Sequence, residues 1–326
     1  CLLVLLARRH EQWKASGRPR GGQLKNLRFA GIAIAIALAL RLASDYAGTS
    51  GHASILTKQR GFYGCLYVKE VKNRDPEWSY RTMYHGITSH GTQFVADTKR
   101  ELPTSYYVRG SGIGIAIDRH PERSTGLNIG VIGLGAGTIA AYAEAQDSLS
   151  FYEINETVVE LADEHFTFQR DATARGANLQ LHVGDARIIL EQQKRNESSQ
   201  EFDVLAVDAF SSDSIPVHLL TRECFELYWH HLKPDGVLAV HISNRYLDLS
   251  PVVRTLSKDL SKTAVLVSYR ARKNRIGSAS TWVLMTSNEE FLQDEGVSEA
   301  ISPWNRPSRD VEWTDQSSSL FSVLLL

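Results

Sequence analysis

The fold is decided by the stretch Asn128-Ile-Gly-Val-Ile-Gly-Leu-Gly-Ala-Gly-Thr138, in which an apolar strand runs straight into a glycine-rich turn. The alanine-rich segment that follows predicts a helix. Gly133, Gly135 and Gly137 allow the backbone to turn sharply and to approach a ligand at the positive end of that helix. The next apolar strand ends on Glu153, a carboxylate placed to grip a pair of ribose hydroxyls. The stretch therefore predicts a nucleoside-binding site.

Strands and helices alternate along the rest of this region, which predicts a doubly wound α/β fold with a mostly parallel sheet and helices on both faces. The last two strands are joined by a loop too short for a crossover helix, so we expect that pair to be antiparallel. The expected strands are 129–134, 149–154, 179–183, 202–207, 237–242, 264–269 and 281–286, and the expected helices are 138–145, 157–166, 186–193, 222–232 and 251–260.

A small antiparallel β-domain is predicted before the α/β region, because short apolar strands there are separated by turn residues. Its strands are expected at 62–71, 78–85 and 92–96, with turns at 73–76 and 89–91, and a helix at 103–117 leads into the larger domain. The predicted organisation is a membrane-associated segment (1–44), a linker (45–60), the β-domain (61–120), the nucleoside-binding domain (121–290) and a carboxyl-terminal extension (291–326).

The amino-terminal segment alternates between apolar and basic stretches. An apolar run at 1–7 and a basic stretch at 8–28 precede the twelve apolar residues 29–40. A bilayer crossing takes about 20 such residues, so we expect part of a larger membrane region or an interfacial helix, with a buried helix of a water-soluble domain as the alternative. We expect a cytoplasmic catalytic domain, because nucleoside donors are made inside the cell. The formal net charge of -1 argues against a nucleic-acid partner.

Further ligand-type groups stand at the carboxyl ends of other predicted strands, where doubly wound folds bind their ligands. Asp185 is suited to accept a hydrogen bond from an adenine amino group, and equally to cap the helix that begins at Ala186. Asp208 and Asp213 bracket a serine-rich loop. Next to a bound sulfonium nucleoside, these two carboxylates are suited to hold a cationic amine and take its proton; the alternative is that Asp213 and Ser214 only cap the loop. No basic residue lies near Asp208 in sequence, so we expect the amine to be its partner.

Five segments together resemble the spermidine synthases, or polyamine aminopropyltransferases, and the match extends from about Phe62 to Ser287. The flanking apolar segments, together with His-Ile-Ser-Asn-Arg245 and Trp-Thr-Asp315, are similar to the bacterial subgroup in which the synthase domain is fused behind membrane helices. The five segments are Val-Ile-Gly-Leu-Gly-Ala-Gly-Thr138, Phe-Tyr-Glu-Ile-Asn155, Val-Gly-Asp-Ala186, Phe-Asp-Val-Leu-Ala-Val-Asp-Ala-Phe210 and Leu-Lys-Pro-Asp-Gly-Val-Leu238.

The resemblance implies a methyltransferase-like Rossmann fold, decarboxylated S-adenosylmethionine as co-substrate, a diamine as acceptor, and neither metal nor bound cofactor. It implies that Glu153 holds the ribose and that Asp185, with Ala186, holds the adenine. Asp208 would be the catalytic acid–base residue, with Asp213 as the second loop aspartate. Tyr106 or Tyr107 would position the amine, and Gln93 would line the donor pocket. A homodimer is the expected assembly.

The chain departs from the family pattern mainly where the amine is bound. Ala136 stands where the family carries an aspartate for the donor's amino group, and Asp213 follows Asp208 by five residues rather than three. Gly64 replaces a glutamine, and the expected Asp-Gly pair reads His90-Gly91. Two other functions therefore remain open: a methyltransferase that uses S-adenosylmethionine, and a non-catalytic nucleoside sensor.

Overall fold

The computed structural model describes residues 52–209, 216–271, 277–304 and 309–325. The expected membrane segment at 1–44, the linker residues 45–51 and the loop aspartate Asp213 lie outside these ranges. Within them, every helix is too short or too polar to cross a bilayer.

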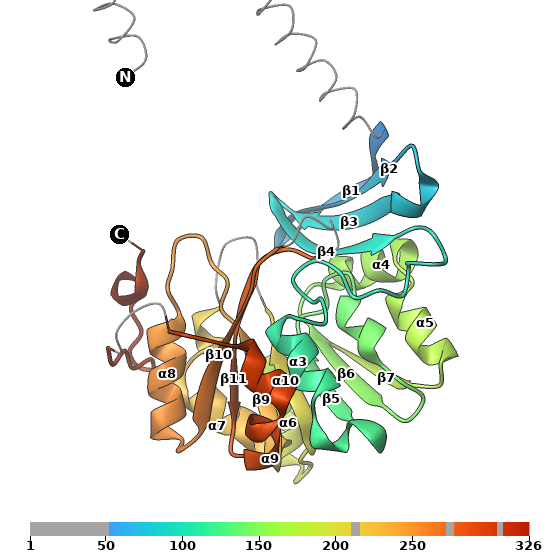
Figure 1. Cartoon of the computed structure of the whole chain (residues 1–326). Helices are drawn as coiled ribbons and strands as arrows, with labels where there is room; N and C mark the ends of the chain where they lie inside the picture. Colours follow the sequence, from blue (N-terminus) through green and yellow to red (C-terminus); the bar gives the residue numbers. More distant parts are fainter. Residues whose placement is uncertain (1–51, 210–215, 272–276, 305–308, 326) are drawn as a thin grey trace, which may run out of the picture. The chain divides into compact units, whose positions relative to one another are not determined.

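A small antiparallel sheet comes first in the described chain, with strands in the order β1-β2-β3-β4 (Figure 1). The linker expectation is wrong from His52 onward, because residues 52–60 form most of β1. Side chains of β1 are mostly exposed, so backbone pairing with β2 holds it and its sequence shows no apolar alternation. The tight turn falls at Gly86-Ile87 rather than at 89–91, since Gly86 adopts a positive φ of 61°. The strands are β1 His52–Gly61, β2 Gly64–Lys72, β3 Tyr80–His85 and β4 Thr88–Phe94.

The large sheet is doubly wound, with the described strands in the order β12-β10-β11-β9-β8-β5-β6-β7. Strands β5 to β9 pair in parallel, while β11 is antiparallel to both β9 and β10, which confirms the expectation for the last two long strands. Chain order reverses between β5 and β8, and this switch point is where such sheets bind ligands. The strands are β5 Asn128–Ile132, β6 Ser148–Glu153, β7 Asn178–Val183, β8 Phe202–Val207, β9 Leu232–His241, β10 Thr263–Tyr269, β11 Ser280–Thr286 and β12 Ile301–Ser302.

Helices cover both faces of this sheet, and a separate apolar core lies under each face. One core joins α3, α4 and α5 to the sheet and takes in Leu66, Val68 and Met83 of the small sheet. The other lies beneath α6, α7 and α8 and includes Trp313 and Val323 of the carboxyl-terminal extension. The helices are α3 Gly112–Asp118, α4 Glu156–His165, α5 Phe168–Ala174, α6 Ala186–Arg195, α7 Arg222–His231, α8 Ser250–Asp259, α9 Glu289–Gln293 and α10 Glu295–Ala300.

Two predicted helices are shorter than expected. The helix expected at 103–117 begins only at Gly112, where the Ser111 side chain accepts a hydrogen bond from Gly114 N–H as an N-cap. The helix expected at 138–145 is a short 3₁₀ turn, η3 (Thr138–Tyr142). Arg175 explains its early end, because the guanidinium donates hydrogen bonds to the carbonyl groups of Ala140 and Ala143, which a continuing helix would use.

Candidate active site

The glycine turn follows β5 at the switch point and has the backbone conformation that only glycine adopts without strain. Gly133 and Gly135 have φ angles of 99° and 54°. A Cβ atom on Gly133 would lie 2.5 Å from the carbonyl oxygen of Asp208, and one on Gly135 would lie 2.5 Å from that of His90. The turn is therefore pressed between the end of β8 and strand β4, which leaves its amide edge toward the space beyond the strands.

Glu153, at the end of β6, is tied to the glycine turn. Its Oε2 accepts a hydrogen bond from Leu134 N–H and its Oε1 accepts one from Asn155 N–H, each at 2.9 Å. The side chain is buried, and burial raises its pKa above the usual range although these backbone donors oppose the shift. Glu153 thus has a structural task in holding the turn, besides its position facing a cavity.

That cavity, of about 240 Å³, lies beyond the ends of β5, β6 and β8, and we name it the nucleoside cavity. Most of the residues expected to contact the donor line it. Those residues are Gly133, Gly135, Glu153, Asp185 and Ala186, with Asp208 at its rim and Tyr63, Leu134 and His218 among the additional lining residues.

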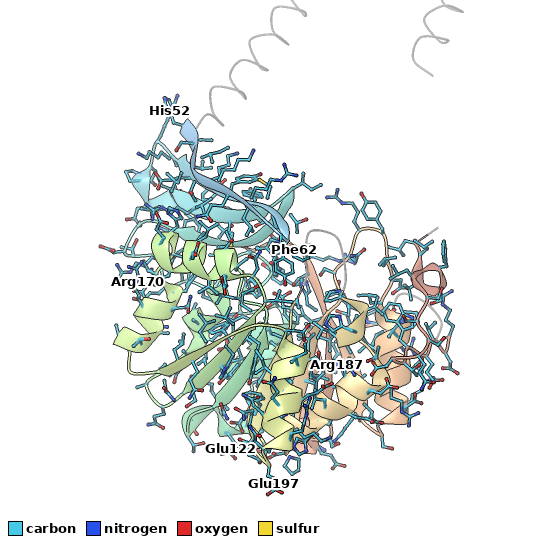
Figure 2. All side chains as sticks on the ribbon, turned by 180° about the vertical axis from the view of Figure 1, so that it is seen from behind. His52, Phe62, Glu122, Arg170, Arg187 and Glu197 are labelled. Atoms are coloured by element: carbon cyan, nitrogen blue, oxygen red, sulfur yellow. The ribbon has the colours of Figure 1, made fainter. Side chains whose placement is uncertain are left out.

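Asp185 performs the capping function that was the alternative to adenine binding. Its Oδ1 accepts a hydrogen bond from Ile188 N–H at 3.1 Å and its Oδ2 lies 3.0 Å from Nε2 of His218. Two residues on, Arg187 forms a bidentate pair with Asp315, so the carboxyl-terminal extension braces α6. Arg187 of α6 is labelled in Figure 2.

Two residues expected at the donor site do not line the nucleoside cavity. Gln93, on β4, is buried, and its amide bonds Arg100 O, Thr167 Oγ1 and Thr167 N–H instead. Gly137 precedes η3 with a φ of 79°, and a Cβ atom there would lie 3.4 Å from Cγ of Gln169. The sequence placed Gln93 on a strand correctly, but only its contacts with Thr167 and Arg100 show which way its amide is used.

Asp208 ends β8 and is held from two sides by residues far away in sequence. The Tyr107 hydroxyl donates a hydrogen bond to its Oδ2 at 2.5 Å, and Nδ1 of His241 lies 2.6 Å from its Oδ1. Its side chain is only 5% exposed. No basic residue lies near Asp208 in sequence, but the fold brings His241 against it from 33 residues away. His241 ends β9 at the same sheet edge as Glu153 and Asp208, and that strand-end position was the signal that would have revealed it.

A second cavity, of about 1180 Å³, opens on the other side of Asp208, and we name it the wide cavity. Tyr106, His241 and Ser243 line it. The Tyr106 ring stacks on the imidazole of His241 with centroids 5.0 Å apart, and its buried hydroxyl has a raised pKa because burial and the charge of Asp208 both disfavour the phenolate. Tyr106 therefore faces the wide cavity as a neutral hydrogen-bonding group.

His90 and Asp208 line both cavities. Burial lowers the pKa of His90 to about 4, so its imidazole is neutral at physiological pH. Its Nε2 is buried without a hydrogen-bond partner among the described residues. The same part of the chain holds no cluster of three or more His, Cys, Asp or Glu side chains suited to a metal ion.

Comparisons with known proteins place these features in context. The chain is 33% identical over 309 residues to the polyamine aminopropyltransferase of Vibrio vulnificus, covering 89% of this chain and 95% of that protein. It is 27% identical over 184 residues to a probable polyamine aminopropyl transferase of Bifidobacterium longum, covering 56% of this chain and 36% of that one. A probable spermidine synthase structure from Corynebacterium glutamicum shares the fold, with a TM-score of 0.55 and 18% identity over 76% of this chain and 86% of that chain. No family model matches the chain.

Proposed function

The chain belongs to the polyamine aminopropyltransferase family, and from that premise we propose that it transfers an aminopropyl group from decarboxylated S-adenosylmethionine to a diamine by direct displacement. One observation carries the assignment of sites: Asp208 lines both the nucleoside cavity and the wide cavity. A sulfonium donor in the first and an amine in the second would meet beside one carboxylate.

The reaction requires a neutral amine. An alkylamine with a pKa near 10 is almost wholly protonated at neutral pH, and its nitrogen has no lone pair for attack. Asp208 attracts the ammonium form and takes its proton. The freed lone pair then attacks the methylene carbon next to sulfur, a C–N bond forms and the C–S bond breaks. The bonding electrons pass to sulfur, which leaves as a neutral thioether, and the positive charge moves to the product amine.

The other site residues bind and orient the substrates. In this proposal Glu153 accepts hydrogen bonds from the ribose hydroxyls, and Asp185 accepts one from the adenine amino group through a remaining lone pair. Tyr106 lines the space for the amine, while Tyr107 holds the carboxylate of Asp208. Asp213 keeps its expected role as a second amine ligand, outside the described residues. Holding the amine in line with the reacting carbon supplies most of the rate enhancement.

The test is turnover by the purified protein with decarboxylated S-adenosylmethionine and a panel of diamines, followed by mass spectrometry. The expected products are methylthioadenosine and a diamine that is heavier by one aminopropyl group. Binding without turnover with any amine would favour a nucleoside sensor and refute the enzyme proposal.

The donor itself is tested by calorimetry, since Ala136 supplies no carboxylate for the donor's amino group. The side chain of Ala136 is buried against Gly91, so at this position the turn can contact the donor only through backbone atoms. We expect decarboxylated S-adenosylmethionine to bind more tightly than S-adenosylmethionine. The reverse order, with methyl transfer to an amine, would establish the methyltransferase instead.

We also propose that residues 1–44 attach the protein to a membrane, with the catalytic domain in the cytoplasm, and that the enzyme forms a homodimer. The apolar run 29–40 beside the basic stretch 8–28 supports attachment. Protease added to intact spheroplasts should leave the catalytic domain uncut, and cleavage from outside would refute the cytoplasmic placement. Light scattering of the purified protein would test the dimer.

A further inference from the structure

His241 is held rigidly in one orientation beside Asp208. Its ring lies between two aromatic rings, with centroids 5.0 Å from Tyr106 and 4.5 Å from Trp282, and interplanar angles of 21° and 16°. Nδ1 lies 2.6 Å from Asp208 Oδ1, and Nε2 lies 2.8 Å from Ser243 Oγ. Only 6% of the residue is exposed. Stacking on both faces and a hydrogen bond at each ring nitrogen leave the ring no freedom to rotate away.

The partners of the two ring nitrogens determine where the imidazole carries its protons. An ionised Asp208 only accepts hydrogen bonds, so Nδ1 must carry a proton. In the neutral ring Nε2 carries no proton and accepts a hydrogen bond from the Ser243 hydroxyl. In the imidazolium Nε2 carries a proton too, and the Ser243 oxygen accepts it after its hydroxyl rotates. Ser243 Oγ also accepts a hydrogen bond from Thr281 N–H at 2.8 Å, which holds that oxygen in place.

We propose that His241 is a positioning residue whose charge decides whether Asp208 binds and deprotonates the acceptor amine, an inference that rests on the proposed transferase function. With a neutral imidazole, the Asp208–His241 pair carries one negative charge, which attracts the ammonium group. With an imidazolium, the pair is neutral overall, so Asp208 is a weaker base and a weaker ligand for a cation. Turnover therefore requires the neutral ring.

Asp208 is a carboxylate in direct contact with His241, and Arg245, Asp248 and Arg270 are the other charged residues of the described chain that line the wide cavity. Tyr106 and Tyr107 pack against the pair, and burial together with the charge of Asp208 raises the pKa of both hydroxyls, so they stay neutral. His90 lies within electrostatic range of Asp208 and is neutral down to a pH of about 4. Trp282 does not titrate. Glu153 has a raised pKa and, in the proposed function, contacts the donor, so its effect is removed by keeping the donor saturating. A loss of rate in acid that then depends on His241 reports the Asp208–His241 pair.

The experiment is the pH dependence of kcat/KM for the diamine, measured at saturating donor for the full chain, His241→Gln and the control His90→Gln. For the wild type we expect the rate to fall about tenfold per pH unit below the midpoint of the pair, because one deprotonated group is required. His241→Gln keeps a side-chain N–H that can donate to Asp208 but does not titrate, so its rate should stay level through that range. His90→Gln should keep the wild-type midpoint whatever its rate, because His90 does not titrate there.

Each outcome decides between defined alternatives. An acid limb that is unchanged in His241→Gln, or lost equally in both variants, would overturn the proposal. No amine-dependent turnover by the wild type would instead defeat the transferase function on which it rests. Should His241→Gln fail to fold, Ser243→Ala serves. This substitution removes the oxygen that accepts a hydrogen bond from the imidazolium. Hydrogen bonds from charged donors are stronger than those from neutral donors, so the imidazolium is destabilised more than the neutral ring. The fall in rate should therefore move to lower pH. An unmoved limb in Ser243→Ala would then overturn the proposal.

Discussion

At the scale of single residues, the site depends on carboxylates whose neighbours are brought together by the fold. Asp208 is surrounded by a tyrosine hydroxyl and an imidazole, and Glu153 by two backbone amides. Each contact satisfies part of a buried carboxylate and leaves lone pairs for a ligand. Binding and orientation therefore use the same oxygen atoms, and substitutions at these positions must be tested for both.

The first prediction concerns Asp208→Asn, which keeps the size of the side chain and removes its charge and basicity. The amide can still accept from Tyr107. We expect amine-dependent turnover to fall roughly 100-fold or more, the usual scale for losing a general base, while donor affinity changes little. Steady-state kinetics and calorimetry measure the two effects. Normal turnover by this variant with any diamine would refute Asp208 as the proton acceptor.

Glu153→Ala should weaken nucleoside binding by about 1.5–3 kcal/mol, typical of hydrogen bonds to a charged group. It should also lower the free energy of unfolding, because the amides of Leu134 and Asn155 lose their acceptors. Glu160→Ala, at an exposed position inside α4, is the matched control and should change neither. An unchanged nucleoside affinity in Glu153→Ala would mean that the ribose binds elsewhere.

The raised pKa of Glu153 adds a pH dependence to this binding. The ionised carboxylate only accepts hydrogen bonds, and it is the form that can accept one from each of two ribose hydroxyls. Affinity should be full above the raised pKa and decline as the pH falls through it, at a higher pH than an exposed glutamate would require. Calorimetric titrations of the nucleoside at several pH values check this sign.

At the scale of elements, the donor site depends on how closely β4 approaches the glycine turn. Ala136 N–H donates a hydrogen bond to His90 O at 2.8 Å. Gly91 beside it has a φ of 119°, and a Cβ atom there would lie 2.7 Å from Ala136 Cβ and 2.9 Å from Thr138 Oγ1. Strand and turn can therefore pack this closely only because position 91 lacks a side chain.

Gly91→Ala should displace β4 from the turn and strain the backbone. We expect weaker nucleoside binding and a loss of stability of about 1 kcal/mol or more, since alanine is unfavourable at positive φ. Gly61→Ala is the control in the same small sheet, because its Cβ would meet Thr157 Oγ1 at an ordinary 3.6 Å. Equal effects of both substitutions on nucleoside affinity would show that the approach of β4 does not shape the site.

At the scale of the whole described domain, the small sheet is joined to the large one by buried polar contacts as well as by a shared core. Gln93 of β4 exchanges hydrogen bonds with Thr167, which precedes α5. Arg81 of β3 donates a hydrogen bond to His165 O at the end of α4. These contacts fix β3 and β4 against the residues that end α4 and precede α5.

Gln93→Met keeps the volume of the side chain and removes its amide, which leaves the buried N–H of Thr167 without an acceptor. We expect the free energy of unfolding to fall by about 1–3 kcal/mol, with nucleoside affinity unchanged. Gln180→Met, on exposed β7, is the control for the substitution itself. Weaker donor binding without loss of stability would restore Gln93 to the donor pocket that the family resemblance implied.

Local sequence determined the strands of the large sheet, the glycine turn and the carboxylates at the strand ends. Burial on both faces makes a parallel strand apolar throughout, and a turn at positive φ demands glycine, so both patterns are readable within a few neighbouring residues. The lengths of η3 and α3 were misjudged, since Arg175 and the Ser111 cap limit them. Polar and exposed β1 left no local pattern, because its pairing with β2 is made by the backbone.

Only the tertiary structure decided the surroundings of Asp208. His241 is 33 residues away in sequence and Tyr107 is 101 residues away, yet both touch its carboxylate. The strand order brings the end of β9 beside the end of β8, and the segment before α3 folds over both. Such contacts depend on which strands become neighbours, and a period of two or 3.6 residues carries no information about that. For the same reason the role of Gln93 follows from its contacts with Thr167 and Arg100 and not from its motif.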